Sequence, residues 1–157
     1  MFYLFLDIDG VLHPDNSPPQ KTLCYAGNLA GVLRDVDPLG RIRIVISSTW
    51  RVKFSIEQLK AMLPSEISER LVGVTPDHIE RPGPYVRQRE IEEWLACNAP
   101  GERWMAVDDW SMIFDKACPN LFLVPGFEAD DGGGLTEGVS LHLKKRLAVE
   151  LNGPVSG

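Results

Sequence analysis

The most constraining feature of the sequence is a short apolar run at the N-terminus that ends in two carboxylates. Residues 2–6 are all apolar or aromatic, and Asp7, Asp9 and Gly10 follow directly. This run predicts a buried strand whose carboxyl end delivers acids to a cleft. Buried carboxylates are costly without a compensating cation or hydrogen bonds, so the pair indicates a metal site. Gly10 would let the backbone turn sharply beside a ligand.

The same segment could instead be a calcium-binding loop or a plain strand end. A calcium loop needs a third oxygen ligand before its glycine and a glutamate further on. Here Gly10 comes too early and no helix precedes it. A plain strand end followed by a turn stays open on this segment alone.

Two later strands are predicted to end in polar groups in the same way. Residues 41–46 run into Ser47, Ser48 and Thr49, and residues 103–107 run into the acids Asp108 and Asp109. Ser48 or Thr49 could cap the next helix, which is compatible with phosphate binding at a helix N-terminus. Adjacent strand residues point to opposite faces, so only one of the two acids enters the cleft directly unless the backbone turns there.

The alternation of strands and helices predicts the fold class. We expect helices over residues 28–36, 56–63, 87–95, 111–117 and 136–151, and further strands over residues 71–75 and 120–124. This pattern predicts an α/β fold, a three-layer, doubly wound and mainly parallel sheet with helices on both faces. It would form a single domain over residues 1–151, with a frayed tail at 152–157. Ligands of such folds bind beyond the carboxyl ends of the strands.

Composition limits the classes of function. A chain of 157 residues that is 44% hydrophobic is long enough for one domain with a substantial core. The net charge of -6 argues against coating nucleic acid or an anionic membrane through bulk charge, although a local basic cleft for nucleic acid stays open. The three cysteines have no metal-site or disulfide-framework spacing, and no membrane-spanning run or basic leader is present, so we expect a cytoplasmic protein. Nothing in the sequence indicates an oligomeric state.

A basic group is needed if the site binds phosphate. Arg87 and Arg89 open a predicted helix, where arginine is unfavourable to the helix dipole, so at least one of them is expected to meet an anion. Lys53 and Lys60, which follow Ser47, are the alternatives.

Together these motifs resemble the haloacid dehalogenase (HAD) superfamily of phosphohydrolases. The resemblance rests on the order of Asp7 to Val11, Ser47, a basic residue opening a later helix, and Asp108 with Asp109. The strings 9–14, 48–51 and 89–91, with Trp94 and Leu95, resemble more narrowly a small bacterial HAD-like family related to a domain of RNA-repair fusion proteins.

The resemblance implies a phosphatase with a role for each matched residue. Asp7 would be the nucleophile, and Asp9 would be the general acid and base and would also bind the metal through its carbonyl. Asp7, Asp108 and Asp109 would hold Mg²⁺ with it. The remaining roles concern the phosphorylated substrate: Ser47 would bind a phosphoryl oxygen, Arg87 or else Arg89 would neutralise the phosphate, and Ser48 and Arg89 would contact the substrate.

The chain is too short for a large cap domain, and two proline-rich loops, at 13–20 and 76–85, could form only a partial lid. An open site suits bulky substrates such as nucleic-acid ends or phosphoproteins. The rival classes are a catalytically silent binding domain, disfavoured because both Asp7 and Asp9 are present, and a receiver-like phosphoacceptor module. A receiver would need an aspartate on a middle strand, where this chain has Ser47 to Thr49.

Overall fold

The computed structural model describes residues 1–77 and 83–153. The strands are β1 (Phe2–Leu6), β2 (Ile42–Ile46), β3 (Leu71–Val74), β4 (Arg103–Asp108) and β5 (Leu121–Leu123). The α-helices are α1 (Ala26–Val36), α2 (Ile56–Met62), α3 (Ser65–Ser68), α4 (Val86–Asn98) and α5 (Glu137–Asn152). Three short 3-10 helices join them: η1 (Pro19–Lys21), η2 (Thr49–Val52) and η3 (Ser111–Ile113).

The five strands form one parallel sheet in the order β3-β2-β1-β4-β5. The chain first builds outward from β1 through β2 to β3, and then returns to place β4 on the other side of β1. The carboxyl ends of β1 and β4 therefore flank the point where the strand order reverses, which is the usual ligand site of open α/β sheets. The predicted doubly wound α/β fold is confirmed.

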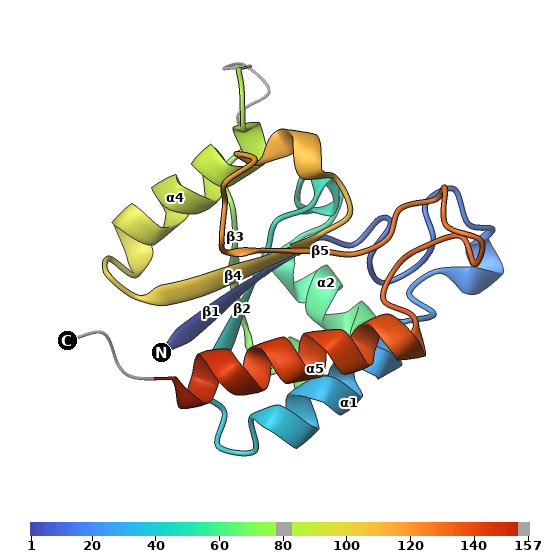
Figure 1. Ribbon diagram of the computed structural model, residues 1–157, viewed down its shortest axis with the longest axis horizontal. Coiled ribbons are helices and arrows are strands. Elements are labelled where there is room, and N and C mark those ends of the chain that lie inside the picture. Colours follow the sequence, from blue (N-terminus) through green and yellow to red (C-terminus); the bar gives the residue numbers. More distant parts are fainter. Residues whose placement is uncertain (78–82, 154–157) are drawn as a thin grey trace.

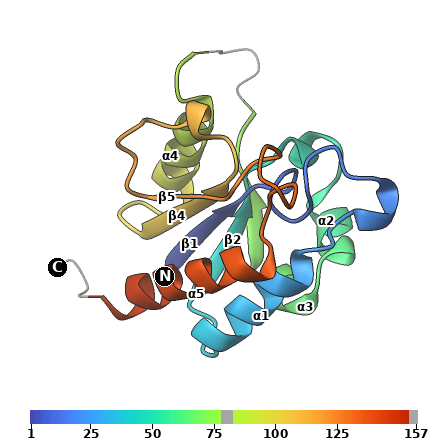
Figure 2. The same ribbon diagram turned by 45° about the vertical axis from the view of Figure 1, so that its right-hand side comes forward.

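The helices lie on both faces of this sheet (Figures 1 and 2). Alternate residues of each strand point to opposite faces, so the strands supply two separate cores. The larger core packs β1 and β2 against α1, α2, α3 and α5. The smaller core packs the other face against α4, with Phe5, Val45 and Ala106 beneath Ile91 and Leu95.

The helix predicted over residues 111–117 is wrong. Only the single turn η3 forms, and Phe114 then becomes extended, with φ -124° and ψ 156°. Phe114 is 1% exposed because it inserts into the smaller core, and burial of this ring outweighs local helix propensity. The Asp115 carboxylate then accepts from the Ala117 N–H and forms a turn instead of a further helical turn.

Between these elements, residues 1–77 and 83–153 contain only loops and single turns, and no cap domain. Part of the second proline-rich loop, residues 78–82, and the end of the expected frayed tail, residues 154–157, lie outside the described residues. No helix within the described part of the chain is long and apolar enough to cross a membrane.

Candidate active site

The register of the sheet brings three polar residues to one level. Leu6 is paired with Ile46 on one side and with Val107 on the other, so the next residue of each strand emerges at the same edge. These residues are Asp7, Ser47 and Asp108. The backbone N–H of Ser47 donates to the Leu6 carbonyl at 2.9 Å and that of Asp7 to the Val107 carbonyl at 3.1 Å, which fixes the alignment.

The three side chains also point to the same face. The residue two positions before each of them packs in the smaller core beneath α4, and strand side chains repeat every two residues. Asp7, Ser47 and Asp108 therefore continue that face beyond the core, toward the start of α4.

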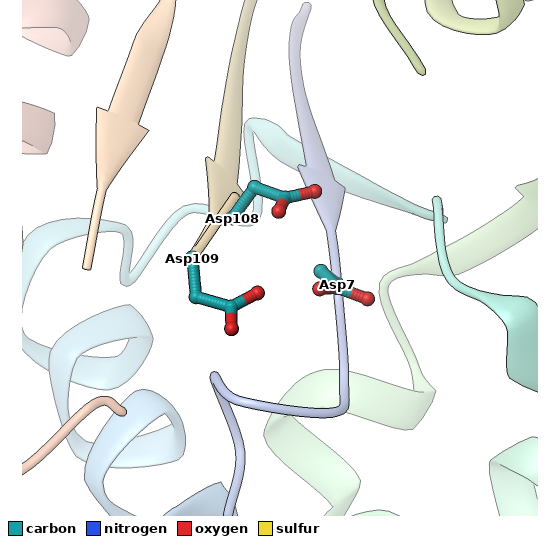
Figure 3. Close-up of side chains that lie close together, drawn as sticks. All are labelled: Asp7, Asp108 and Asp109. Atoms are coloured by element: carbon teal, nitrogen blue, oxygen red, sulfur yellow. The ribbon is translucent and has the colours of Figure 1, made fainter. Parts of the chain in front are cut away.

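Asp109 joins Asp7 and Asp108 to form a carboxylate cluster (Figure 3). One carboxylate oxygen from each lies within 4.8 Å of the other two. Asp109 can enter because β4 ends at Asp108, whose carboxylate accepts from the Trp110 N–H at 2.9 Å and turns the chain. Adjacent strand residues point to opposite faces, so both acids can reach the cleft only because the backbone turns after Asp108.

Gly10 lies in the loop after β1, next to the Asp109 carboxylate of this cluster. Its φ is +76°, in the left-handed region, and a Cβ atom there would collide with the Asp109 carboxylate. The position therefore requires glycine for both its conformation and the available space.

The carboxylate cluster is electrostatically strained without a cation. Burial raises the pKa of Asp7 well above its usual value, and the neighbouring Asp108 adds to this while Arg87 opposes it. Burial raises the pKa of Asp108 to about 7, and burial also raises the pKa of Asp109. Three carboxylate oxygens at this spacing fit a hard divalent cation such as Mg²⁺, which would remove this strain.

Asp9 lies outside the carboxylate cluster and has its own hydrogen bonds. Its Oδ1 accepts from Trp50 Nε1 at 3.0 Å and lies 2.8 Å from His13 Nε2. The Leu23 N–H donates to His13 Nδ1 at 3.1 Å, so the hydrogen-bond pattern assigns the ring proton to Nε2. Both rings therefore donate to a single oxygen of Asp9.

Two buried donors face the carboxylate cluster without a hydrogen-bond partner among the described residues. They are Ser47 Oγ and Arg87 Nε. Arg87 Nε lies 3.9 Å from Asp108 Oδ2, within ion-pair range but too far for a hydrogen bond. The Nε atoms of Arg41, Arg51 and Arg70 are likewise unpaired, so an unpaired buried donor alone identifies no site here. Because Ser47 Oγ and Arg87 Nε lie beside the carboxylate cluster, they are available to an anion bound there. Ser48 differs, because it is fully buried and its hydroxyl accepts from the Trp50 N–H as the cap of η2.

Arg51 is a cation of the site that the sequence did not single out. Its side chain is 5% exposed, and its Nη2 lies 3.1 Å from Glu90 Oε1. Glu90 Oε2 in turn lies 3.2 Å from Arg87 Nη1, so one buried carboxylate holds two arginines. The string Ser48 to Arg51 was the available signal, but it did not reveal that α4 would cover the arginine.

The structure places the other basic candidates elsewhere. Arg89 lies two residues after Arg87, about 200° around the helix, and its Nε donates to the Pro84 carbonyl at 3.1 Å. Lys60 is exposed on α2. Lys53 lines a groove with Asp9. Only Arg87 of these four comes within ion-pair distance of the carboxylate cluster in the described contacts.

Comparison with known proteins agrees with this geometry. No curated protein and no solved structure matches the chain. A family model described as the HAD domain in Swiss Army Knife RNA repair proteins matches residues 3–136, which include β1 except its first residue, β2 to β5 and every residue of the carboxylate cluster. The chain therefore belongs to the family of HAD domains found in Swiss Army Knife RNA repair proteins.

Proposed function

We propose that this HAD domain is a Mg²⁺-dependent phosphohydrolase that acts through an aspartyl-phosphate on Asp7. The observation that carries the proposal is the meeting of the carboxylate cluster with two unpaired buried donors, Ser47 Oγ and Arg87 Nε. Carboxylates repel a phosphate, so a site that binds one beside Asp7 needs cations and hydrogen-bond donors. This arrangement has both a cation position and donors.

In the first step, an oxygen of Asp7 attacks the phosphorus atom, and the bond from phosphorus to the ester oxygen breaks. Asp9 gives its proton to the departing oxygen. Because Oδ1 of Asp9 is occupied by His13 and Trp50, the transferred proton is carried on Oδ2. Ser47 and Arg87 hold the phosphoryl oxygens meanwhile.

In the second step, Asp9 takes a proton from water, and the resulting hydroxide attacks the phosphorus atom. The bond between phosphorus and Asp7 breaks, which releases inorganic phosphate and restores both carboxyl groups. Asp7, Asp108 and Asp109, with the Asp9 carbonyl, would hold Mg²⁺, whose charge screens the repulsion between Asp7 and the phosphate.

The phosphorylated substrate we favour is the phosphate-bearing end of a nucleic acid. The name of the matched family supports this choice, and the described chain has no cap that would restrict the site to small molecules. The acidic net charge of -6 means that such binding would rely on local cations.

Phosphate release tests the proposed activity. Wild-type protein should hydrolyse p-nitrophenyl phosphate and 5′- or 3′-phosphorylated oligonucleotides with Mg²⁺ and lose this activity in EDTA. Asp7→Asn should lower kcat by at least about a thousandfold, because the nucleophile is gone. Glu92→Gln, on the exposed side of α4, is the matched control. Turnover retained in Asp7→Asn contradicts the mechanism, and no turnover in the wild type with any ester favours a silent binding domain.

A further inference from the structure

Two grooves flank the site and meet at Asp15, which lines both. The first, which we call the Asp9 groove, has a volume of about 420 Å³ and contains Asp9, Trp50 and Lys53. The second, which we call the Asp109 groove, has a volume of about 460 Å³ and contains Asp109 and Trp110. A substrate whose phosphate lies at Asp7 can extend into either groove.

The proposed reaction selects between them. Attacking and leaving oxygens lie roughly in line on opposite sides of the phosphorus atom. The leaving oxygen must therefore be near the acid that protonates it, which is Asp9. Asp9 lines the first groove and Asp109 lines the second, so the leaving group belongs in the Asp9 groove.

The chemistry of the Asp9 groove indicates what leaving group it accepts. Asn16, Ser17 and Thr22 offer amide and hydroxyl groups, and beside the acids Asp9 and Asp15 the described lining has one lysine, Lys53. Lys53 is exposed and forms no ion pair within the described part of the chain. An ammonium here, at the C-cap of η2, can meet a negative group on the substrate.

The Asp109 groove is more acidic than the Asp9 groove. Asp15, Asp109 and Glu128 make it acidic, and its large side chains are exposed, with Met112 79% and Phe127 71% exposed. No lysine or arginine is among its described lining residues. A substrate with a second negative group would be repelled there.

We propose that the Asp9 groove is the leaving-group subsite and that Lys53 binds a second anionic group of the substrate. This inference rests on the proposed function. The ligand class is a phosphate ester of a polar, hydroxyl-bearing alcohol that carries a further phosphate. A nucleic-acid strand and a phosphorylated sugar share this chemistry.

Paired substrates test the proposal. We would measure phosphate release from a nucleoside bisphosphate and the matching monophosphate, and from a sugar bisphosphate and the matching monophosphate. Wild-type protein should prefer the bisphosphate of a pair in kcat/KM. Lys53→Met should reduce this preference roughly tenfold, the lower range for a hydrogen bond to a charged group. A preference for the bisphosphate in the nucleoside pair alone indicates that the natural substrate is a nucleic-acid strand. An equal preference in both pairs indicates that the site recognises only the second phosphate.

Matched variants make the result specific. Lys60→Met removes another exposed lysine, which does not line the groove, and should leave the preference unchanged. Trp110→Ala, in the Asp109 groove, should also leave the preference unchanged. The proposal is overturned if Lys53→Met keeps the full preference or if Trp110→Ala abolishes it.

Binding separates this inference from the proposed activity. In the Asp7→Asn background, calorimetry should show tighter binding of the nucleoside bisphosphate than of the monophosphate, and Lys53→Met should reduce this difference by a similar factor. If the wild type hydrolyses no ester while this Lys53-dependent difference persists, the activity is wrong and the subsite stands. If esters are hydrolysed without any such difference, the subsite is wrong.

Discussion

The two carboxylate oxygens of Asp9 have different surroundings. Oδ1 receives hydrogen bonds from His13 and Trp50, whereas Oδ2 has no partner among the described residues. The backbone supports this arrangement, since Leu23 takes a left-handed φ of 57° where its N–H donates to His13. In the proposed mechanism, Asp9 held in this way presents one oxygen for proton transfer, and the two rings act by positioning it.

Trp50→Phe should therefore slow protonation of the leaving group. The variant keeps the ring packed near Phe54, 5.1 Å away between centroids, and removes one donor to Asp9. We expect kcat to fall roughly tenfold for an alkyl phosphate, which needs the acid, and about twofold for p-nitrophenyl phosphate, whose leaving group needs little protonation. Trp104→Phe, the same change at a tryptophan packed against the smaller core, is the control. Equal losses on both substrates would mean that the tryptophan is only structural.

At the residue scale, the sequence revealed the acids and the serine but not the full set of cations. Asp7, Ser47 and Asp108 each follow an apolar run, so a strand reading alone predicts that they meet at one edge. Arg51 follows no such rule, because its role depends on burial under α4. The sequence could not decide whether Arg87 or Arg89 faces the site, because that depends on where α4 begins.

At the scale of elements, α4 carries the arginine that faces the carboxylate cluster and the acid that holds it. Arg87 lies in the first turn of α4 and Glu90 one turn later, so both lie on one helix face. Glu90 is 3% exposed and also pairs with Arg51 from η2. The carboxylate therefore ties η2 to α4 across the end of the sheet. Periodicity predicted the helix, but it could not predict a pairing between elements 39 residues apart.

Glu90→Gln should test this link. The amide keeps the size of the side chain but leaves two buried guanidinium groups without their shared counter-charge. We expect the free energy of unfolding to fall by about 2–4 kcal/mol, as for other broken buried ion pairs. Urea denaturation measures this. Glu92→Gln, which changes an exposed acid on the same helix, should cost less than about 0.5 kcal/mol. An equal effect of the two variants would exclude a central role for Glu90.

For the whole molecule, sheet topology explains why the acids gather where they do. The strand order reverses between β1 and β4, and the three members of the carboxylate cluster lie at or directly after the carboxyl ends of these two strands. The alternating pattern of the sequence was sufficient to predict this fold and this edge. It failed at residues 111–117, where burial of Phe114 decided the structure. Repulsion and burial of the three carboxylates lower the free energy of unfolding of the whole fold, and this decrease can be measured.

Stability should therefore depend on pH in the absence of divalent cations. The pKa of Asp108 in the folded protein is about 7, above its ordinary 3.8, and that of Asp7 is also raised. Between these pH values the folded protein retains protons that the unfolded chain has lost, so the free energy of unfolding decreases as pH rises from about 4 to about 7. We expect a loss on the order of a few kcal/mol in EDTA. Urea denaturation at pH 5 and pH 8 measures it.

Two further measurements attribute this loss to the carboxylate cluster. Mg²⁺ at pH 8 should restore most of it, because the ion binds the deprotonated carboxylates of the folded state and not the unfolded chain. Asp108→Asn removes one of the shifted groups and should flatten the pH dependence. Asp35 and Glu66, whose pKa values are lowered, act with the opposite sign but at pH values below this range. A stability that rises from pH 5 to pH 8 in EDTA, or that is indifferent to Mg²⁺ at pH 8, would contradict a cation site at Asp7, Asp108 and Asp109.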